Sequence, residues 1–289
     1  MAIRLLVALI ALGLLHVTPQ LARWRKDGWF RQWVTQLADT SGTGRVLLAL
    51  LPPLLACLLL AWWFSHSPTG ELLELLFSLA VLLYCFGPRE FEPDLEAILS
   101  APDNASREAA AQALADDGAA IAWSSPKLGA AIAYAALRRR FAVLFWFFLL
   151  GPVGALLYRL AQTLYRDVSL RLDPGSCTSA RYLANALDWL PAQALVFTLA
   201  VVGHWEAVIG AWQRWHQQAT STGWYSASPG FLGAAAQADV LTDIETCDDR
   251  FEECNDPLVE LVRLRSALLR ALLAWLSVVA LVVIGGWLH

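Results

Sequence analysis

The sequence contains little charge. Only 16% of its 289 residues are Asp, Glu, Lys or Arg, whereas 57% are hydrophobic and 14 are Trp. This composition excludes an ordinary soluble domain and is typical of a membrane protein, whose first partner is the lipid bilayer. The formal net charge of −4 provides no positive field for nucleic acid, so we expect no nucleic-acid partner.

The sequence also lacks the short motifs that identify common cofactor and catalytic sites. It contains no P-loop, no dinucleotide-binding glycine pattern, no nucleophile elbow and no HExxH zinc motif. Its five cysteines form no C-x-x-C pair, and its acidic residues fit no calcium-binding loop. We therefore predict no metal ion, no cofactor and no catalytic residue from motifs.

What the sequence does contain is a series of long apolar stretches. A helix of about 20 residues crosses a ~30 Å hydrocarbon core. We therefore predict an all-α, polytopic transmembrane helical protein that forms a single integral membrane domain over residues 1–289. Residues 88–140 and 204–267 are predicted to be mainly extramembrane, with membrane-proximal cytoplasmic helices. The predicted hydrophobic segments are residues 2–18, 45–64, 71–87, 141–158, 183–203 and 268–288.

The distribution of basic residues predicts the orientation in the membrane. Residues 23–33, which precede the segment at 45–64, mix Arg and Lys with Trp and Phe. The loop at residues 65–70, which follows that segment, contains no Lys or Arg. The positive-inside rule therefore places the first stretch on the cytoplasmic side and the loop on the outer side.

The central segment at 141–158 carries no charge but contains Gly151, Pro152 and Gly154, which we predict to form a structural turn. The segment can cross the membrane as one kinked helix, or it can return as a re-entrant hairpin. We favour the kinked span, because the segment is long enough to cross and no polar group inside it requires a cavity. A kinked span places four arginines outside, against the positive-inside rule: Arg159, Arg166, Arg171 and Arg181.

Arginines at the two ends of the central segment are candidate ligand-binding residues. Arg138, Arg139 and Arg140 precede it, and Arg159 follows it. Three adjacent arginines commonly set the membrane orientation, and they also suit binding of a phosphate or carboxylate. Both interpretations are open at this point.

Asp188 is the fifth candidate ligand-binding residue. It lies within the predicted segment at 183–203, where an acidic residue indicates function by default. Its natural partner is an arginine such as Arg159 or Arg181. The alternative is that Asp188 lies at the membrane interface and caps a neighbouring helix end.

Three stretches of the sequence resemble a known family. Residues 85–99 read CFGPREFEPDLEAIL, residues 138–160 read RRRFAVLFWFFLLGPVGALLYRL and residues 186–193 read ALDWLPAQ. In this order and spacing they resemble AmpE, a family of bacterial inner-membrane proteins named as modulators of β-lactamase induction. AmpE is itself similar to the CobD/CbiB group, membrane enzymes that join an aminopropanol unit to adenosylcobyric acid in cobalamin synthesis.

The resemblance implies a multi-pass protein of the bacterial inner membrane with a regulatory role. An AmpE-like protein is expected to link cell-wall fragments to β-lactamase expression, by binding a small-molecule or protein partner at the cytoplasmic face. The alternative is a membrane enzyme of the CobD/CbiB type, which forms an amide with ATP, or an enzyme acting on a related phosphorylated or carboxylated substrate. A transporter is the weaker alternative.

Two stretches depart from the cobalamin enzymes of this group. Those enzymes carry an acidic, Asn-containing stretch where residues 134–140 read YAALRRR, and Asn-Thr-Leu-Asp where residues 162–165 read QTLY. The loss of carboxylates removes groups that can hold Mg²⁺ or act as a general base. We therefore expect a retained scaffold with changed or lost chemistry, which favours a non-enzymatic role.

Overall fold

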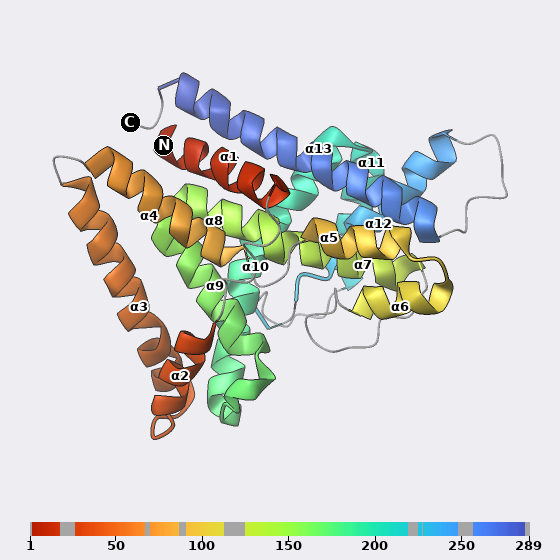
Figure 1. The fold of residues 1–289 in the computed structure, drawn as a ribbon. Coiled ribbons are helices and arrows are strands. Elements are labelled where there is room, and N and C mark those ends of the chain that lie inside the picture. The colour runs from red at the N-terminus through yellow and green to blue at the C-terminus, as the bar shows by residue number, and fades with distance from the viewer. Residues whose placement is uncertain are drawn as a thin grey trace. The chain divides into compact units, whose positions relative to one another are not determined.

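In the computed structural model of the chain, every regular element is a helix within the residues that the structure describes, and none is a strand (Figure 1). The described residues are 2–17, 27–66, 70–86, 91–112, 125–218, 225–226, 228–247 and 257–286. The all-α fold class predicted from the sequence is confirmed.

Three of the described helices are long and apolar enough to cross a membrane: α3 (Gly42–Ser65), α10 (Pro174–Val202) and α13 (Pro257–Ile284). The shorter α1 (Ala2–Val17) is apolar as well. The protein is therefore an all-α membrane protein. Its predicted single domain and six hydrophobic segments stay predictions.

The surface of α3 shows why this helix belongs in lipid. Leu55, Leu59 and Trp63, which recur at every fourth position, are 53%, 63% and 68% exposed. Ala49 and Cys57 of the same helix are buried. A continuous exposed row of large apolar side chains is unfavourable in water and favourable against acyl chains.

The chain forms two compact units. The first comprises residues 1–90, 142–187 and 282–289, and the second comprises residues 91–141 and 188–281. The helices α10 and α13 contribute residues to both units.

In the first unit, α3 packs against α4 and α9, and α1 packs against α4 and α8. The short α2 precedes α3, and the short 3₁₀ turn η3 follows α9. The elements introduced here are α2 (Gly28–Gln36), α4 (Gly70–Cys85), α8 (Ala142–Leu150), α9 (Pro152–Arg166) and η3 (Val168–Leu170).

The chain reverses direction between α8 and α9. Gly151 has a φ of 71°, a left-handed conformation that favours glycine, and Pro152 begins α9. Gly154 lies so close to the Trp146 carbonyl oxygen that a Cβ atom would collide with it. The two helices therefore form a packed hairpin (Figure 1), and the single kinked helix favoured from the sequence is wrong.

Arg4 of α1 stabilises this reversal. Its Nη1 donates to the carbonyl oxygens of Phe148, at 2.9 Å, and of Leu149, at 3.3 Å. Carbonyl groups in the last turn of a helix have no partner within the helix, and an apolar environment offers no water instead. Arg4, a charged residue in an otherwise apolar helix, thus supplies the hydrogen-bond donor that the last carbonyl groups of α8 need.

The starts of α3 and α10 meet at one end of the first unit, where basic residues lie. The Oδ2 atom of Asp173, which precedes α10, accepts from the backbone N–H of Gly42, at 3.2 Å, and of Ser176, at 3.0 Å. These bonds hold the first turns of α3 and α10 together, and hydrogen bonding from Ser176 lowers the pKa of Asp173 to about 2. Arg45 lies beside the same carboxylate, with 3.7 Å between Nη1 and Oδ1. We call this end of the unit the basic end.

The reversal at Gly151 brings the last turn of α9 to the basic end as well, where Arg31 of α2 pairs with Asp167. The arginines that follow α8 therefore lie at the same end of the unit as the start of α3. The sequence-based placement of these arginines opposite the start of α3 is wrong. Residues 23–26 of the predicted basic stretch lie outside the described residues.

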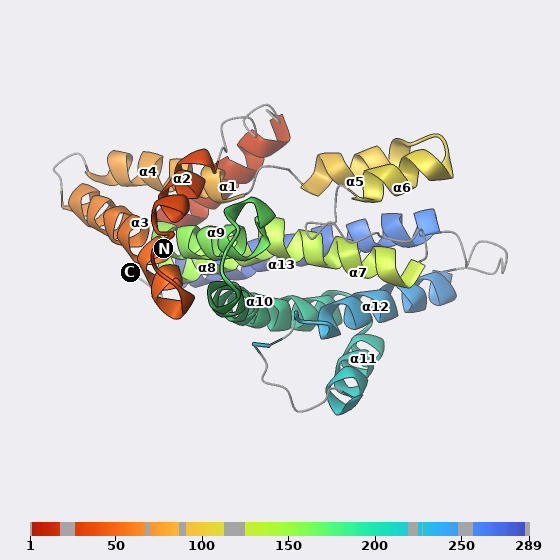
Figure 2. The same cartoon turned by 90° about the horizontal axis from the view of Figure 1, so that it is seen from below.

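In the second unit, α12 packs against α7 and α11, and Figure 2 shows α7 and α12 side by side. Small residues allow this approach: a Cβ atom at Gly233 would lie 2.8 Å from that of Ala130. The elements introduced here are α5 (Phe91–Ser100), α6 (Asn104–Gln112), α7 (Ser125–Ala136), the π-helical turn η2 (Leu137–Phe141), α11 (Trp205–Gln218) and α12 (Phe231–Cys247).

We predict that Gly154→Ala destabilises the protein by about 1–3 kcal/mol, because the new Cβ atom overpacks the contact between α8 and α9. Thermal unfolding in detergent, followed by circular dichroism, measures this effect. Gly44→Ala is the matched control, since no atom lies within 4 Å of a Cβ atom built at that position in α3. Equal unfolding midpoints for the two variants would contradict the close packing of the hairpin.

We also predict that Cys177, an exposed residue in the first turn of α10, reacts with a membrane-impermeant maleimide from the cytoplasmic face only. The measurement uses a variant that retains this single cysteine, in vesicles of either orientation. His66→Cys in a cysteine-free background is the control, because it places a thiol at the opposite end of α3 and should react from the outer face. Labelling of both positions from one face would refute the assigned orientation.

Candidate functional site

The three adjacent arginines lie in η2, within the second unit, and each is paired with a carboxylate. Arg138 Nε lies 3.7 Å from Asp188 Oδ2. Arg139 Nη1 donates to Asp94 Oδ2 at 2.6 Å. Arg140 Nη1 donates to Glu92 Oε1 at 3.1 Å, and Arg265 Nη2 lies 3.1 Å from Glu92 Oε2. The arginine cluster is defined by these residues: Glu92, Asp94, Arg138, Arg139, Arg140, Asp188 and Arg265.

Helix geometry explains how neighbouring arginines reach different partners. Successive residues of any helix, including a π-helical turn, point in different directions, so three in a row are distributed around its axis. Glu92 and Asp94 lie in the first turn of α5, where carboxylates also complement the helix dipole. The arginine cluster thus connects η2 with α5, α10 and α13.

Asp188 is the most deeply buried member of this cluster, with a side chain that is 1% exposed. The structure pairs it with Arg138, an arginine that the sequence analysis did not name as its partner. Arg138 also lies over the Tyr134 ring, 5.4 Å from its centroid. Burial raises the pKa of Tyr134 to about 12, and the protonated hydroxyl donates to the Pro229 carbonyl oxygen at 2.9 Å.

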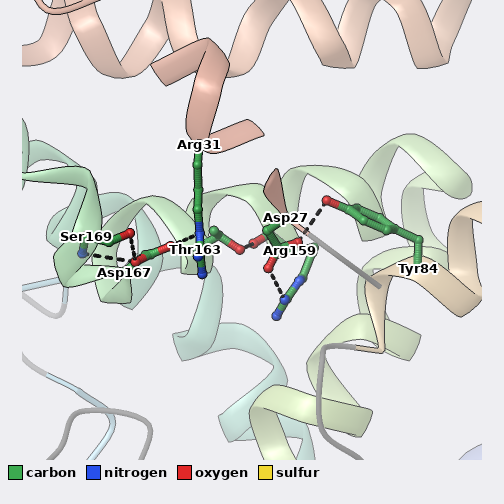
Figure 3. Close-up of polar contacts among 7 residues, drawn as sticks. All are labelled: Asp27, Arg31, Tyr84, Arg159, Thr163, Asp167 and Ser169. Atoms are coloured by element: carbon green, nitrogen blue, oxygen red, sulfur yellow. Dashed lines mark hydrogen bonds and ion pairs between the residues drawn. The ribbon is translucent and has the colours of Figure 1, made fainter. Parts of the chain in front are cut away.

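Arg159, the remaining candidate, lies in α9 of the first unit and pairs with Asp27. Its Nη2 donates to Asp27 Oδ2 at 2.7 Å, and Tyr84 Oη donates to Asp27 Oδ1 at 2.9 Å (Figure 3). Trp29 Nε1 in turn donates to the Tyr84 hydroxyl at 3.2 Å. Asp27 is largely buried, with a side chain that is 9% exposed.

A second ion pair joins α2 to α9 in the same region. Arg31 Nε lies 2.6 Å from Asp167 Oδ2, and Asp167 Oδ1 accepts from the backbone N–H of Ser169 at 3.1 Å (Figure 3). We call the pairs Asp27–Arg159 and Arg31–Asp167 the α2 clasp. They attach the start of α2 to the middle and to the end of α9.

Asp27 and Tyr84 are site residues that sequence reasoning missed. One signal was present, because Asp27 is the single acidic residue in the basic stretch at 23–33. An isolated carboxylate among cations and aromatic residues indicates an ion pair, but its partner lies far away in the sequence. Within the described residues, no group of three or more His, Cys, Asp or Glu side chains could hold a metal ion.

We predict that Arg138→Ala lowers the free energy of unfolding by about 3–5 kcal/mol, because it removes this guanidinium from a deeply buried carboxylate. Chemical unfolding in mixed micelles measures the change. Arg263→Ala is the control, since Arg263 is 41% exposed and its pair with Asp243, at 3.2 Å, should contribute less than about 1 kcal/mol. Similar decreases in the free energy of unfolding for the two variants would show that the buried pair contributes no more to stability than the exposed pair.

Comparison with known proteins gives one informative match. The chain is 30% identical over 208 residues to the cobalamin biosynthesis protein CobD of Chromobacterium violaceum, a match that covers 67% of this chain and 61% of the relative. No family model matches the chain, and no solved structure matches it. The match does not confirm the resemblance to AmpE. It supports a relation between this chain and the CobD/CbiB group.

Proposed function

We propose that this protein is a membrane enzyme of the CobD type that acts in cobalamin biosynthesis. The similarity to a cobalamin biosynthesis protein over 208 residues carries this proposal. The CobD/CbiB resemblance implies a reaction in which a C–N bond replaces a carboxyl C–O bond, while the oxygen leaves in phosphate derived from ATP. The substrate class is therefore a large carboxylated precursor and a small amine.

We place the protein in the bacterial inner membrane, with the basic end of the first unit at the cytoplasmic face. The positive-inside rule supports this orientation, because the arginines at the ends of α2, α3, α9 and α10 lie together. A water-soluble carboxylated precursor made in the cytoplasm can reach this face. Arg159 and Tyr84 are the donors that suit a carboxylate there.

The arginine cluster has a different part in this proposal. Each of Arg138, Arg139 and Arg140 is already within 4 Å of a carboxylate of the protein, so the cluster holds α5 and α10 to η2. These arginines then hold helices of the second unit to one another, and they do not have to bind substrate directly. Arg159 is the candidate residue that we assign to substrate binding.

An AmpE-like modulator is the second candidate function. One observation favours it: the arginines at 138–140 stand where the cobalamin enzymes of the resemblance carry acidic and Asn residues, and they pair with carboxylates of the chain itself. A scaffold of this kind can be retained after its chemistry is lost. The partner would then be a cell-wall fragment or a protein at the cytoplasmic face.

The direct test expresses the chain in a bacterium that lacks its own CobD. We predict that membranes from this strain convert adenosylcobyric acid and aminopropanol into the amide, detected by mass spectrometry. Arg159→Gln should lower the amount of product at least about tenfold, which corresponds to ~1.4 kcal/mol. Arg214→Gln should leave it unchanged, because Arg214 is exposed on α11 and bonds to the Gly210 carbonyl of its own helix.

Absence of product from a folded, membrane-inserted chain would contradict the CobD-type function. The same strain then separates the two candidates, because β-lactamase induction can be measured in it. A changed induction together with no amide product would favour the AmpE-like function.

A further inference from the structure

We propose that Arg159 and Tyr84 form a receptor for the carboxylate of a ligand, and that Asp27 occupies this receptor in the present structure. The two oxygens of Asp27 accept from two different elements: Oδ2 from Arg159 Nη2 of α9, at 2.7 Å, and Oδ1 from Tyr84 Oη of α4, at 2.9 Å (Figure 3). Both oxygens of the Asp27 carboxylate are thus engaged by donors from other helices. The inference deepens the proposed function by naming the group recognised.

The position of Asp27 supports this interpretation. Asp27 is the N-cap residue of α2, where an aspartate normally accepts from backbone N–H groups of the first turn. Its side chain makes no such capping bond. The carboxylate is instead directed to α4 and α9, so its position serves the contact with Arg159 and Tyr84 and not the stability of α2.

The hydrogen-bonding capacity of Arg159 is incompletely used. Asp27 engages Nη2 alone, while Arg159 Nε is buried and has no hydrogen-bond acceptor among the described residues. A guanidinium binds a carboxylate best through two parallel N–H donors, which one oxygen of Asp27 does not provide. An incoming carboxylate that used both Nε and Nη2 would therefore be held more strongly than Asp27.

The structure also allows Asp27 to leave without displacing α2. Phe30 and Val34 are fully buried and anchor the helix downstream of Asp27. The second pair of the α2 clasp, Arg31–Asp167, has a half-exposed arginine and constrains the helix weakly. Asp27 precedes the first helical residue, so its carboxylate can turn away while the buried anchors remain in place.

Chemical rescue tests this receptor in the full-length protein. Asp27→Ala removes the carboxylate and leaves both donors facing the vacated space. We predict that acetate raises the thermal unfolding midpoint of Asp27→Ala in a saturable manner, relative to chloride at equal ionic strength. The wild-type protein and the double variant Asp27→Ala/Arg159→Gln should not respond, and neither should Asp39→Ala, which removes an exposed aspartate of the same unit.

The outcomes are distinct. A folded Asp27→Ala that responds neither to acetate nor to inorganic phosphate overturns the receptor, and a response to phosphate at lower concentrations than to acetate overturns its assignment to a carboxylate. If Asp27→Ala does not fold, Asp27→Asn replaces it, because acetate competes more readily with a neutral amide than with a carboxylate. Asp27→Asn should then respond at acetate concentrations that leave the wild type unchanged, and no response overturns the proposal.

The experiments can refute the carboxylate receptor and the proposed function independently of each other. Acetate rescue without amide formation leaves the carboxylate receptor standing and removes the cobalamin reaction. Amide formation without rescue leaves the reaction standing and shows that Asp27–Arg159 is a structural pair.

Discussion

The reversal of the chain at Gly151 is the constraint on which the first unit depends. Its local requirements are a left-handed residue, a proline that begins the next helix and a glycine against the Trp146 carbonyl. Its environmental requirement is a donor for the carbonyl groups at the end of α8, since a helix that ends in an apolar environment leaves them unsatisfied. Arg4 supplies that donor from α1. The reversal then directs α9 towards the basic end, which brings Arg159 to Asp27.

Ion pairs stabilise the interior of each unit separately, and their burial determines what they can do. Removing two charges from water is costly, so a buried pair contributes little net stability compared with apolar packing but is damaging to break. In the arginine cluster the carboxylates of α5 and α10 fix the direction in which η2 presents its side chains. In the α2 clasp Asp27 contacts a single nitrogen of Arg159, and Arg159 Nε has no hydrogen-bond acceptor among the described residues.

The sequence was sufficient for the fold class, because apolar runs of helical length admit few structures in a membrane. It also located the turn, since Gly151, Pro152 and Gly154 are residues that interrupt helices. It was insufficient for the direction of the chain after the turn, which depends on a φ value and on the approach of Gly154 to Trp146. The composition and length of the segment at 141–158 are equally compatible with a kinked span and with a hairpin, so they do not distinguish the two. The partners Asp27–Arg159 and Arg138–Asp188 were equally inaccessible, because ion pairs between distant residues follow from packing and leave no periodic signal.

The measurement that tests this account most directly is the distance between spin labels at residues 145 and 165, determined by pulsed electron paramagnetic resonance in lipid nanodiscs. An uninterrupted or gently kinked helix separates these positions by ~30 Å along its axis. The hairpin predicts a distance well below that value, because α8 and α9 lead away from the same turn and pack together. A distance near ~30 Å would contradict the reversal and with it the placement of Arg159 at the basic end.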